Sequence, residues 1–270
     1  MHQAPLKFNI RRPLLVFAHV FALVGVLLAP AHAGAQEASN GRAGQLERAA
    51  SLIGSNQLAE AERQLNLVLK VAPEEAGALN LLGAIRAKQG KLDEAEALFS
   101  RAVESDKRLT GARMNLAYLF LLKGEPEKTA AELKEVLRLE PANVEAAYRL
   151  AWLLLKQGRP DECINLIERV RQSQKLSAPL LALLGDAYVR RGDTGKGIAA
   201  LKNAIELSPA EPSYHYTLGV AWLRHPADLQ EAEQSFRRFL GFRPDDAQGQ
   251  LHLGYVLLKQ KRHAEARELL

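Results

Sequence analysis

The sequence predicts an all-α protein built as a solenoid of antiparallel helix hairpins, and three observations predict it. The first is a period of 34 residues, by which Gly83 and Gly90 return three steps later as Gly185 and Gly192. The second is that each period holds two amphipathic stretches separated by a break, which is typical of a helix hairpin. The third is a proline at the end of several periods, where it stops a helix. A fixed period of this size indicates a repeat array rather than one globular core.

A separate segment precedes the repeats. Three basic residues, the last of them Arg12, come before an apolar run over residues 14–28 and an Ala-His-Ala sequence that ends at Ala33. This is the order of a secretory signal peptide, so we expect residues 1–33 to be removed, with cleavage after Ala33 or, as a second choice, after Ala35. The alternative is an uncleaved membrane anchor, but the run is short beside the ~20 residues of a spanning helix. The mature protein is therefore expected to be exported, either periplasmic or secreted.

Charge and cysteine content limit the function further. The chain has 36 basic and 31 acidic residues, and loss of the signal peptide leaves 33 against 31. These charges are mixed along the helices, which does not favour a nucleic-acid partner. Cys163 is the only cysteine, so no internal disulfide can form. A reactive or intermolecular role for this thiol is one interpretation, and a small buried core residue is the other.

The rest of the chain divides into a flexible lead-in, residues 34–41, and a repeat array, residues 42–270. The lead-in is small and polar and has no apolar periodicity. The array holds about seven repeats, numbered internally from position 1: 42–75, 76–109, 110–143, 144–177, 178–211, 212–246 and an incomplete 247–270. The last start is displaced by one residue because the turn around Pro226 carries a single insertion.

Each repeat is interpreted in the same way. The first helix ends in basic residues or Gln, followed by a glycine that accepts a left-handed conformation, as at Gly90, Gly124, Gly158 and Gly192. The second helix opens with acidic residues such as Asp93 and Glu94, which suit a helix N-terminus. Prolines then stop it, namely Pro73, Pro141, Pro209 and Pro244.

Small and large side chains alternate at fixed positions. Position 8 is always Gly or Ala, and position 20 is small, as Ala61, Ala95, Thr129, Cys163, Gly197, Ala232 and Ala266. Two helices approach closely only where side chains are small. Position 24 is large and apolar, as Leu65, Phe99, Leu133, Ile167, Leu201, Phe236 and Leu270. We expect position 24 to fill the core between hairpins.

Position 11 holds an aromatic or apolar side chain (Phe120, Leu154, Tyr188, Trp222), and position 32 holds proline. Together with the small and large positions above, this pattern resembles the tetratricopeptide repeat. The resemblance covers residues 42–270 and implies a right-handed superhelical solenoid, in which first-helix positions 2, 5, 9, 12 and 13 line a concave groove. There are departures from the family pattern: the favoured Trp at position 4 is absent, Arg86 stands at position 11, and Lys107 and Lys175 replace the proline.

The groove is the candidate site for a partner. The predicted contact residues are Asn80, Met114, Tyr118, Tyr148, Trp152, Lys156, Asp186, Arg190, Tyr216, Arg224, Tyr255 and Lys259. Tyr and Trp make good contact anchors, although they can instead pack against the next repeat. Position 13 is basic in five repeats, as Lys88, Lys156, Arg190, Arg224 and Lys259, which suits acidic groups on a ligand or else compensates the helix dipole.

No catalytic, metal or cofactor pattern is present in the sequence. It has no HExxH, no GxSxG and no cysteine cluster. Residues 192–197 hint at a phosphate loop, but Arg190 and Gly197 stand where that motif needs Gly and Ser or Thr. The Lys and Asn pattern by which some family members hold a chaperone's C-terminal carboxylate is also absent, since Tyr148 and Trp152 occupy such positions.

The sequence therefore predicts an exported, non-enzymatic scaffold that binds a protein or peptide segment in its groove, with no cofactor, metal, nucleic acid or small-molecule substrate. Family analogy suggests cell-envelope assembly as the setting. One alternative is the substrate-presenting portion of a larger enzyme. Another is self-association through the apolar end left by a seventh repeat that stops at Leu270; truncation of the chain at that point is the equal alternative interpretation.

Overall fold

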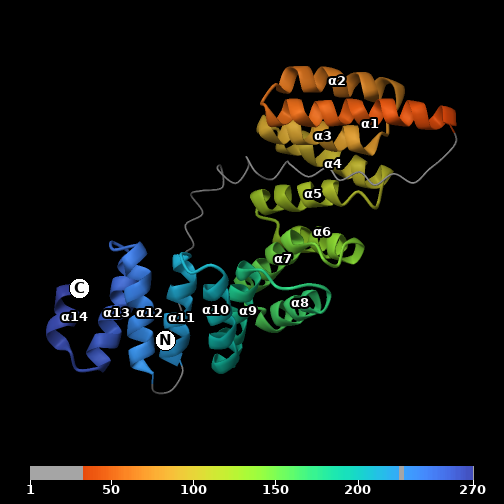
Figure 1. Ribbon diagram of the computed structural model, residues 1–270. Coiled ribbons are helices and arrows are strands. Elements are labelled where there is room, and N and C mark those ends of the chain that lie inside the picture. Colours follow the sequence, from red (N-terminus) through yellow and green to blue (C-terminus); the bar gives the residue numbers. More distant parts are fainter. Residues whose placement is uncertain (1–32, 225–227, 270) are drawn as a thin grey trace. The chain divides into compact units, whose positions relative to one another are not determined.

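The computed structural model of the protein describes residues 33–224 and 228–269, with side chains from residue 41 onward. The expected signal peptide lies outside the described residues, apart from the backbone of Ala33. The described residues form fourteen α-helices and no strand (Figure 1), which confirms the all-α class. None of these helices combines the length and apolarity that a bilayer crossing requires.

The helices alternate as first and second members of hairpins. The first helices are α1 (Ala33–Gly54), α3 (Ala76–Lys88), α5 (Thr110–Lys123), α7 (Val144–Lys156), α9 (Ala178–Arg191), α11 (Pro212–Arg224) and α13 (Ala247–Lys259). The second helices are α2 (Leu58–Val71), α4 (Leu92–Ser105), α6 (Pro126–Leu139), α8 (Pro160–Ser173), α10 (Thr194–Leu207), α12 (Leu229–Phe242) and α14 (His263–Leu269). From α3 on, every first helix begins where the sequence starts a repeat. The α12 helix begins one residue late, as an insertion near Pro226 requires, although Pro226 itself lies outside the described residues.

The start of α1 differs from the sequence-based expectation. This helix begins at Ala33, so residues 34–41 have a helical backbone where a flexible lead-in was predicted. The segment contains Ala, Gln and Glu, which are strong helix formers. Because backbone hydrogen bonds need no apolar stripe, a helix can continue outward from the first repeat without the periodicity on which the prediction relied.

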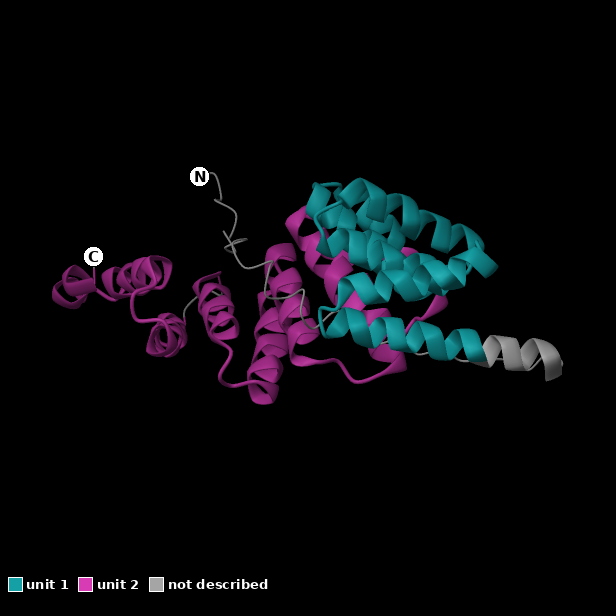
Figure 2. Cartoon of the chain, turned by 90° about the horizontal axis from the view of Figure 1, so that it is seen from above, with its two compact units in different colours: residues 1–132 teal, residues 133–270 magenta. Residues whose placement is uncertain are grey.

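The chain divides into two compact units (Figure 2), unit 1 ending at Glu132 and unit 2 beginning at Leu133, within α6. In unit 1, α3 packs against α1, α2 and α4, and α5 packs against α3 and α4. In unit 2, α9 contacts α7, α8, α10 and α11, and α12 lies between α11 and α13. The first helices α7, α9 and α11 of unit 2 are therefore in serial contact, which matters for the site described below.

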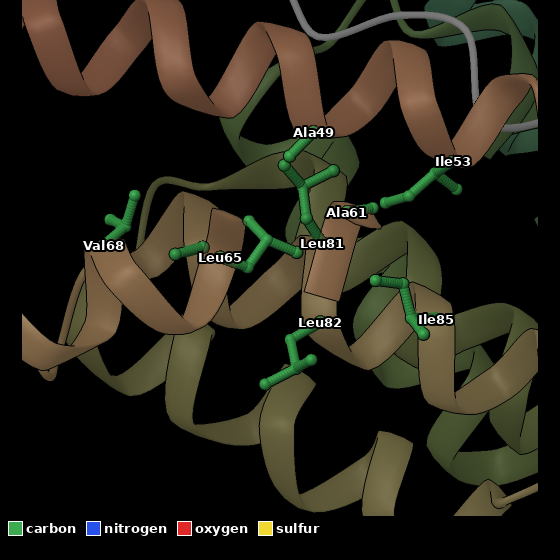
Figure 3. Close-up of a cluster of buried hydrophobic side chains, with 9 residues drawn as sticks. Ala49, Ile53, Ala61, Leu65, Val68, Leu81, Leu82 and Ile85 are labelled. Atoms are coloured by element: carbon green, nitrogen blue, oxygen red, sulfur yellow. The ribbon is translucent and has the colours of Figure 1, made fainter. Parts of the chain in front are cut away.

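The core follows the predicted positions. Position 24 is fully buried in every repeat where the structure describes its side chain, as Leu65, Phe99, Leu133, Ile167, Leu201 and Phe236. Figure 3 shows one cluster of unit 1, where Ile53 of α1, Leu65 of α2 and Ile85 of α3 belong to a single apolar core. The role assigned to position 24 is confirmed. Because each cluster draws on neighbouring hairpins, no hairpin buries its apolar face alone.

The structure describes the turn inside six of the seven hairpins, all but that between α11 and α12, and each of the six has one left-handed residue. Gly90, Gly124, Gly158 and Gly192 have φ of 78°, 73°, 72° and 104°, as predicted for glycine beyond a helix end. Asn56 and Lys261 occupy the equivalent place in the first and last repeats with φ of 61° and 64°. The backbone of the hairpin turn is thus the same whether or not glycine is present, and the two other residues carry its steric cost.

Position 4, where the family favours Trp, carries a polar side chain in four repeats, and in the three of these that follow another repeat it makes the same bond. That side chain donates to the carbonyl oxygen six residues earlier, at position 32 of the preceding repeat. The bonds are Arg113 Nε to Lys107 at 3.2 Å, His215 Nε2 to Pro209 at 2.8 Å and Gln250 Nε2 to Pro244 at 2.9 Å. We call this the position-4 bond. It satisfies a carbonyl just past the end of a helix and holds the turn between two repeats.

One hairpin is tighter than the others. In the α9–α10 pair both facing small positions are glycine, Gly185 and Gly197. A methyl group added to Gly197 would lie 2.8 Å from the Gly185 carbonyl oxygen and 2.5 Å from Cγ2 of Val189. Only hydrogen atoms fit in that space, so these two helices are held together at backbone contact distance.

Candidate protein-binding site

Unit 1 carries three of the predicted groove residues. Asn80, Met114 and Tyr118 are half-buried. The Asn80 side-chain oxygen accepts a hydrogen bond of 2.8 Å from Asn115 Nδ2, which links α3 to α5. At position 13 the exposed Lys88 is followed in the next repeat by Leu122, 45% exposed. The predicted row of cations is therefore interrupted in unit 1.

Unit 2 presents aromatic side chains on α7 and α11. Tyr148 and Trp152 of α7 are half-buried, and burial raises the pKa of Tyr148. Tyr214 of α11, which the sequence analysis did not select, has its pKa raised to about 12 by burial, then by the Glu211 carboxylate and by Tyr148. Because Glu211 acts on both tyrosines, the three side chains lie in one electrostatic neighbourhood that spans α9. The run Tyr-His-Tyr at residues 214–216 was the sequence signal for this residue.

Tyr216 behaves differently from the other predicted anchors. Its ring centroid lies 5.1 Å from that of Phe239, 5.8 Å from that of Phe236 and 5.4 Å from that of His252. This is the alternative interpretation of the sequence, in which an aromatic residue at position 5 packs against neighbouring helices. Tyr255, at position 9 of α13, is 47% exposed instead.

The cations at position 13 do form a series in unit 2. The exposed residues Lys156, Arg224 and Lys259 end α7, α11 and α13, and the exposed Arg190 is the second-last residue of α9; we call these four residues the basic row. Arg190 Nη1 donates to the Leu155 carbonyl at 3.3 Å, and Arg224 Nη1 donates to the Val189 carbonyl at 3.4 Å. Each of these carbonyls belongs to the last turn of the preceding first helix. Dipole compensation therefore operates, but between repeats rather than within one helix.

The basic row keeps a capacity for anions. Asp186 pairs with Arg190 at 2.9 Å. Each guanidinium has five N–H groups, more than these contacts use. The pKa of Lys156 is lowered by burial and then by the positive charge of Arg190, so the two cations repel each other. The Nζ atoms of Lys156 and Lys259 lie 5.4 Å from the ring centroids of Trp152 and Tyr255.

The part of the chain that the structure describes shows no arrangement for catalysis. Burial raises the pKa of the Cys163 thiol to about 12, which keeps it protonated and unreactive at neutral pH. No group of three or more metal-ligating side chains converges among these residues. Residues 192–197, which hint at a phosphate loop, form the α9–α10 turn and the start of α10.

The fold defines a class of protein, the helix-hairpin repeat scaffold. Models of the tetratricopeptide repeat match residues 120–187 and, separately, 46–108 with 227–270, and a TPR repeat model matches 185–225. The chain is a tetratricopeptide repeat protein.

Relatives and solved structures agree with this assignment. The TPR repeat-containing protein PA4667 of Pseudomonas aeruginosa is 29% identical over 153 residues, covering 55% of this chain and 26% of the relative. Cellulose synthase operon protein C of Pseudomonas fluorescens is 26% identical over 155 residues, covering 54% of this chain and 12% of the relative. The crystal structure of YrrB, described as a TPR protein with an unusual peptide-binding site, has a TM-score of 0.60 at 16% identity, covering 73% of this chain and 97% of that one. The chain thus spans 26% and 12% of the lengths of these two curated relatives.

Proposed function

We propose that this protein is a non-enzymatic scaffold that binds an extended segment of another protein on the first-helix face of unit 2. The observation that carries the proposal is the basic row, with Tyr148, Trp152 and Tyr214 on the same helices. The aromatic residues supply apolar contact area, and the cations orient acidic groups of the partner. Preformed helices lose little conformational entropy when they bind.

A display-selected peptide tests this proposal. A library of random peptides is selected on the mature protein, and the affinities of the enriched peptides are measured by calorimetry. The variant Tyr148→Ala, Trp152→Ala removes two half-buried anchors and should weaken binding at least tenfold, about 1.4 kcal/mol. The control variant Leu207→Ala, Phe242→Ala removes apolar side chains that are 60% and 49% exposed on second helices, and it should bind as the parent does. Equal losses in the two variants, or none in either, would refute binding at this face.

We also propose that the protein is exported and takes part in assembly in the cell envelope. The support is the order of basic, apolar and small residues before residue 34. Mass spectrometry of the protein purified from fractionated cells tests export. An N-terminus at Gly34 or Gln36 in the periplasmic or external fraction is the expected result. An intact N-terminus in the cytoplasmic fraction would contradict it.

The second candidate function is presentation of a substrate to an enzyme. It is favoured by the match to cellulose synthase operon protein C, of which this chain covers only 12%. Copurification separates the two functions. Under this alternative a catalytic polypeptide copurifies with the array at equal stoichiometry. The KM of that enzyme for its substrate changes when the array carries Tyr148→Ala, Trp152→Ala. The primary proposal expects no such change.

A further inference from the structure

The basic row repeats with a constant step, and that step carries information about the partner. Its members stand at the same position of successive first helices, one cation for each repeat. The hydrogen bonds from Arg190 and Arg224 to the preceding first helix show that neighbouring helices are within reach of one side chain. Packed helices lie about 8–10 Å apart, so Lys156, Arg190 and Arg224, on the serially packed helices α7, α9 and α11, present a positive charge roughly every 9 Å.

An extended partner meets this step only in some conformations. A polyproline II helix has three residues per turn and rises ~3.1 Å per residue, so every third side chain returns to the same face after about 9 Å. A β-strand returns after two residues, about 7 Å, or four, about 13 Å, and both values miss the step. An α-helix returns to nearly the same face after seven residues, about 10.5 Å, which is also close. Spacing alone therefore leaves the polyproline II helix and the α-helix.

The aromatic side chains favour the first of these. Proline-rich segments dock on surfaces lined with aromatic rings, and their polyproline II conformation is already formed before binding. Here the row is accompanied by Trp152 and Tyr255, each with the lysine of its own helix 5.4 Å from the ring centroid. Each pair sets apolar surface beside a positive charge. A proline next to an acidic residue matches both features.

From this geometry we infer that the partner segment is a proline-rich polyproline II helix with an acidic residue at every third position, lying across α7, α9 and α11 with its carboxylates on Lys156, Arg190 and Arg224. The inference rests on the proposed function, which it refines by naming the chemistry and spacing of the ligand. Asp186 occupies one side of Arg190 and leaves the remaining donors for the partner. Asp186 already offsets part of the repulsion between Lys156 and Arg190, and a partner carboxylate beside the two cations would offset more of it.

Synthetic peptides of about twelve residues test the spacing, with fluorescence anisotropy as the readout. The first peptide repeats Glu-Pro-Pro, the second has the same composition with its glutamates contiguous, and the third is a helical peptide with glutamate at every seventh residue. We expect the first to bind about tenfold more tightly than either control, a difference of 1.4 kcal/mol. The variant Lys156→Glu, Arg224→Glu should abolish that preference. The variant Arg169→Glu, Arg238→Glu changes the same charge at exposed sites on α8 and α12 and should retain it.

Each other outcome overturns the inference. Equal affinity for the first two peptides would mean that the row attracts negative charge without regard to spacing. Tighter binding of the helical peptide would mean that the partner is an α-helix. Failure of all acidic peptides, while a display-selected peptide still binds through Tyr148 and Trp152, would reject the acidic ligand and leave the proposed function standing. If display yields no peptide that depends on those residues, the proposed function fails separately.

Discussion

Replacing Gly197 with alanine should destabilise the α9–α10 hairpin, although the same change stabilises most helices. The new methyl group would lie 2.8 Å from the Gly185 carbonyl oxygen and 2.5 Å from Cγ2 of Val189. A backbone oxygen cannot rotate away, and a β-branched valine in a helix has one favoured rotamer. The two helices must therefore separate.

The magnitude follows from two opposing effects. Overpacking a well-filled contact costs about 1–3 kcal/mol. Alanine recovers about 0.5–1 kcal/mol of the helix propensity that glycine lacks. The free energy of unfolding of this hairpin should fall by roughly 0.5–2 kcal/mol. Gly195, two residues earlier in α10, has no atom within 4 Å of an added methyl group, so Gly195→Ala should raise it by about 0.4–1 kcal/mol.

Native-state hydrogen exchange of the α9 and α10 amides is the suitable assay, because repeat arrays unfold in segments and a single transition midpoint averages over them. The two variants should shift the opening free energy in opposite directions. If Gly197→Ala protects these amides as well as Gly195→Ala does, the close approach of α9 and α10 is refuted.

Three other predictions concern single residues. His215→Ala should lower the free energy of unfolding by about 2–3 kcal/mol, since it removes the position-4 bond to Pro209 and leaves a cavity, whereas His215→Gln keeps a donor and should cost less than half as much in urea unfolding. Cys163 should react with a thiol reagent at pH 8 only after denaturation. Because burial raises the pKa of its thiol from the usual 9.0 to about 12 in the folded protein, Cys163 stabilises the fold fully below pH 9. This stabilisation is lost as the pH rises toward 12. Rapid labelling of the folded protein would contradict this. Asn143→Ala should cost about 1 kcal/mol by removing the N-cap of α7, while Asn143→Ser, which keeps an acceptor oxygen without adding a charge beside Glu140, should cost less, as followed by thermal unfolding with circular dichroism.

Much of the fold was predictable because it depends on local signals. The glycine at position 15 marks a turn whose backbone only glycine adopts without steric cost, and the left-handed φ of Gly192 agrees with this. The large residue at position 24 has an amphipathic helix around it, so its burial follows from periodicity. Asn56 and Lys261 take the same left-handed turn without a glycine; asparagine tolerates that conformation, but the identity of Lys261 gives no signal of it.

The candidate site was less predictable because it depends on contacts between distant residues. Tyr216 and Tyr148 both stand at position 5, yet only Tyr216 meets an aromatic cluster, built from α12 and α13. The position of an aromatic residue in the repeat does not show whether it packs inside the protein or contacts a partner, because this depends on the side chains of the neighbouring helices. The position-4 bond was also missed, because Arg, His and Gln share a donor rather than a recognisable residue type.

The position-4 bond has a consequence for how such an array grows. Its donor and acceptor are six residues apart and join the end of one repeat to the start of the next. The bond is therefore encoded by a short stretch of sequence and does not depend on the rest of the chain. A gene segment of one period, copied in frame, would contain both the donor and the acceptor of this bond. Lengthening by duplication then changes the number of repeats without creating an unsupported turn, and three unlike donors show how widely a copied block can diverge before that support is lost.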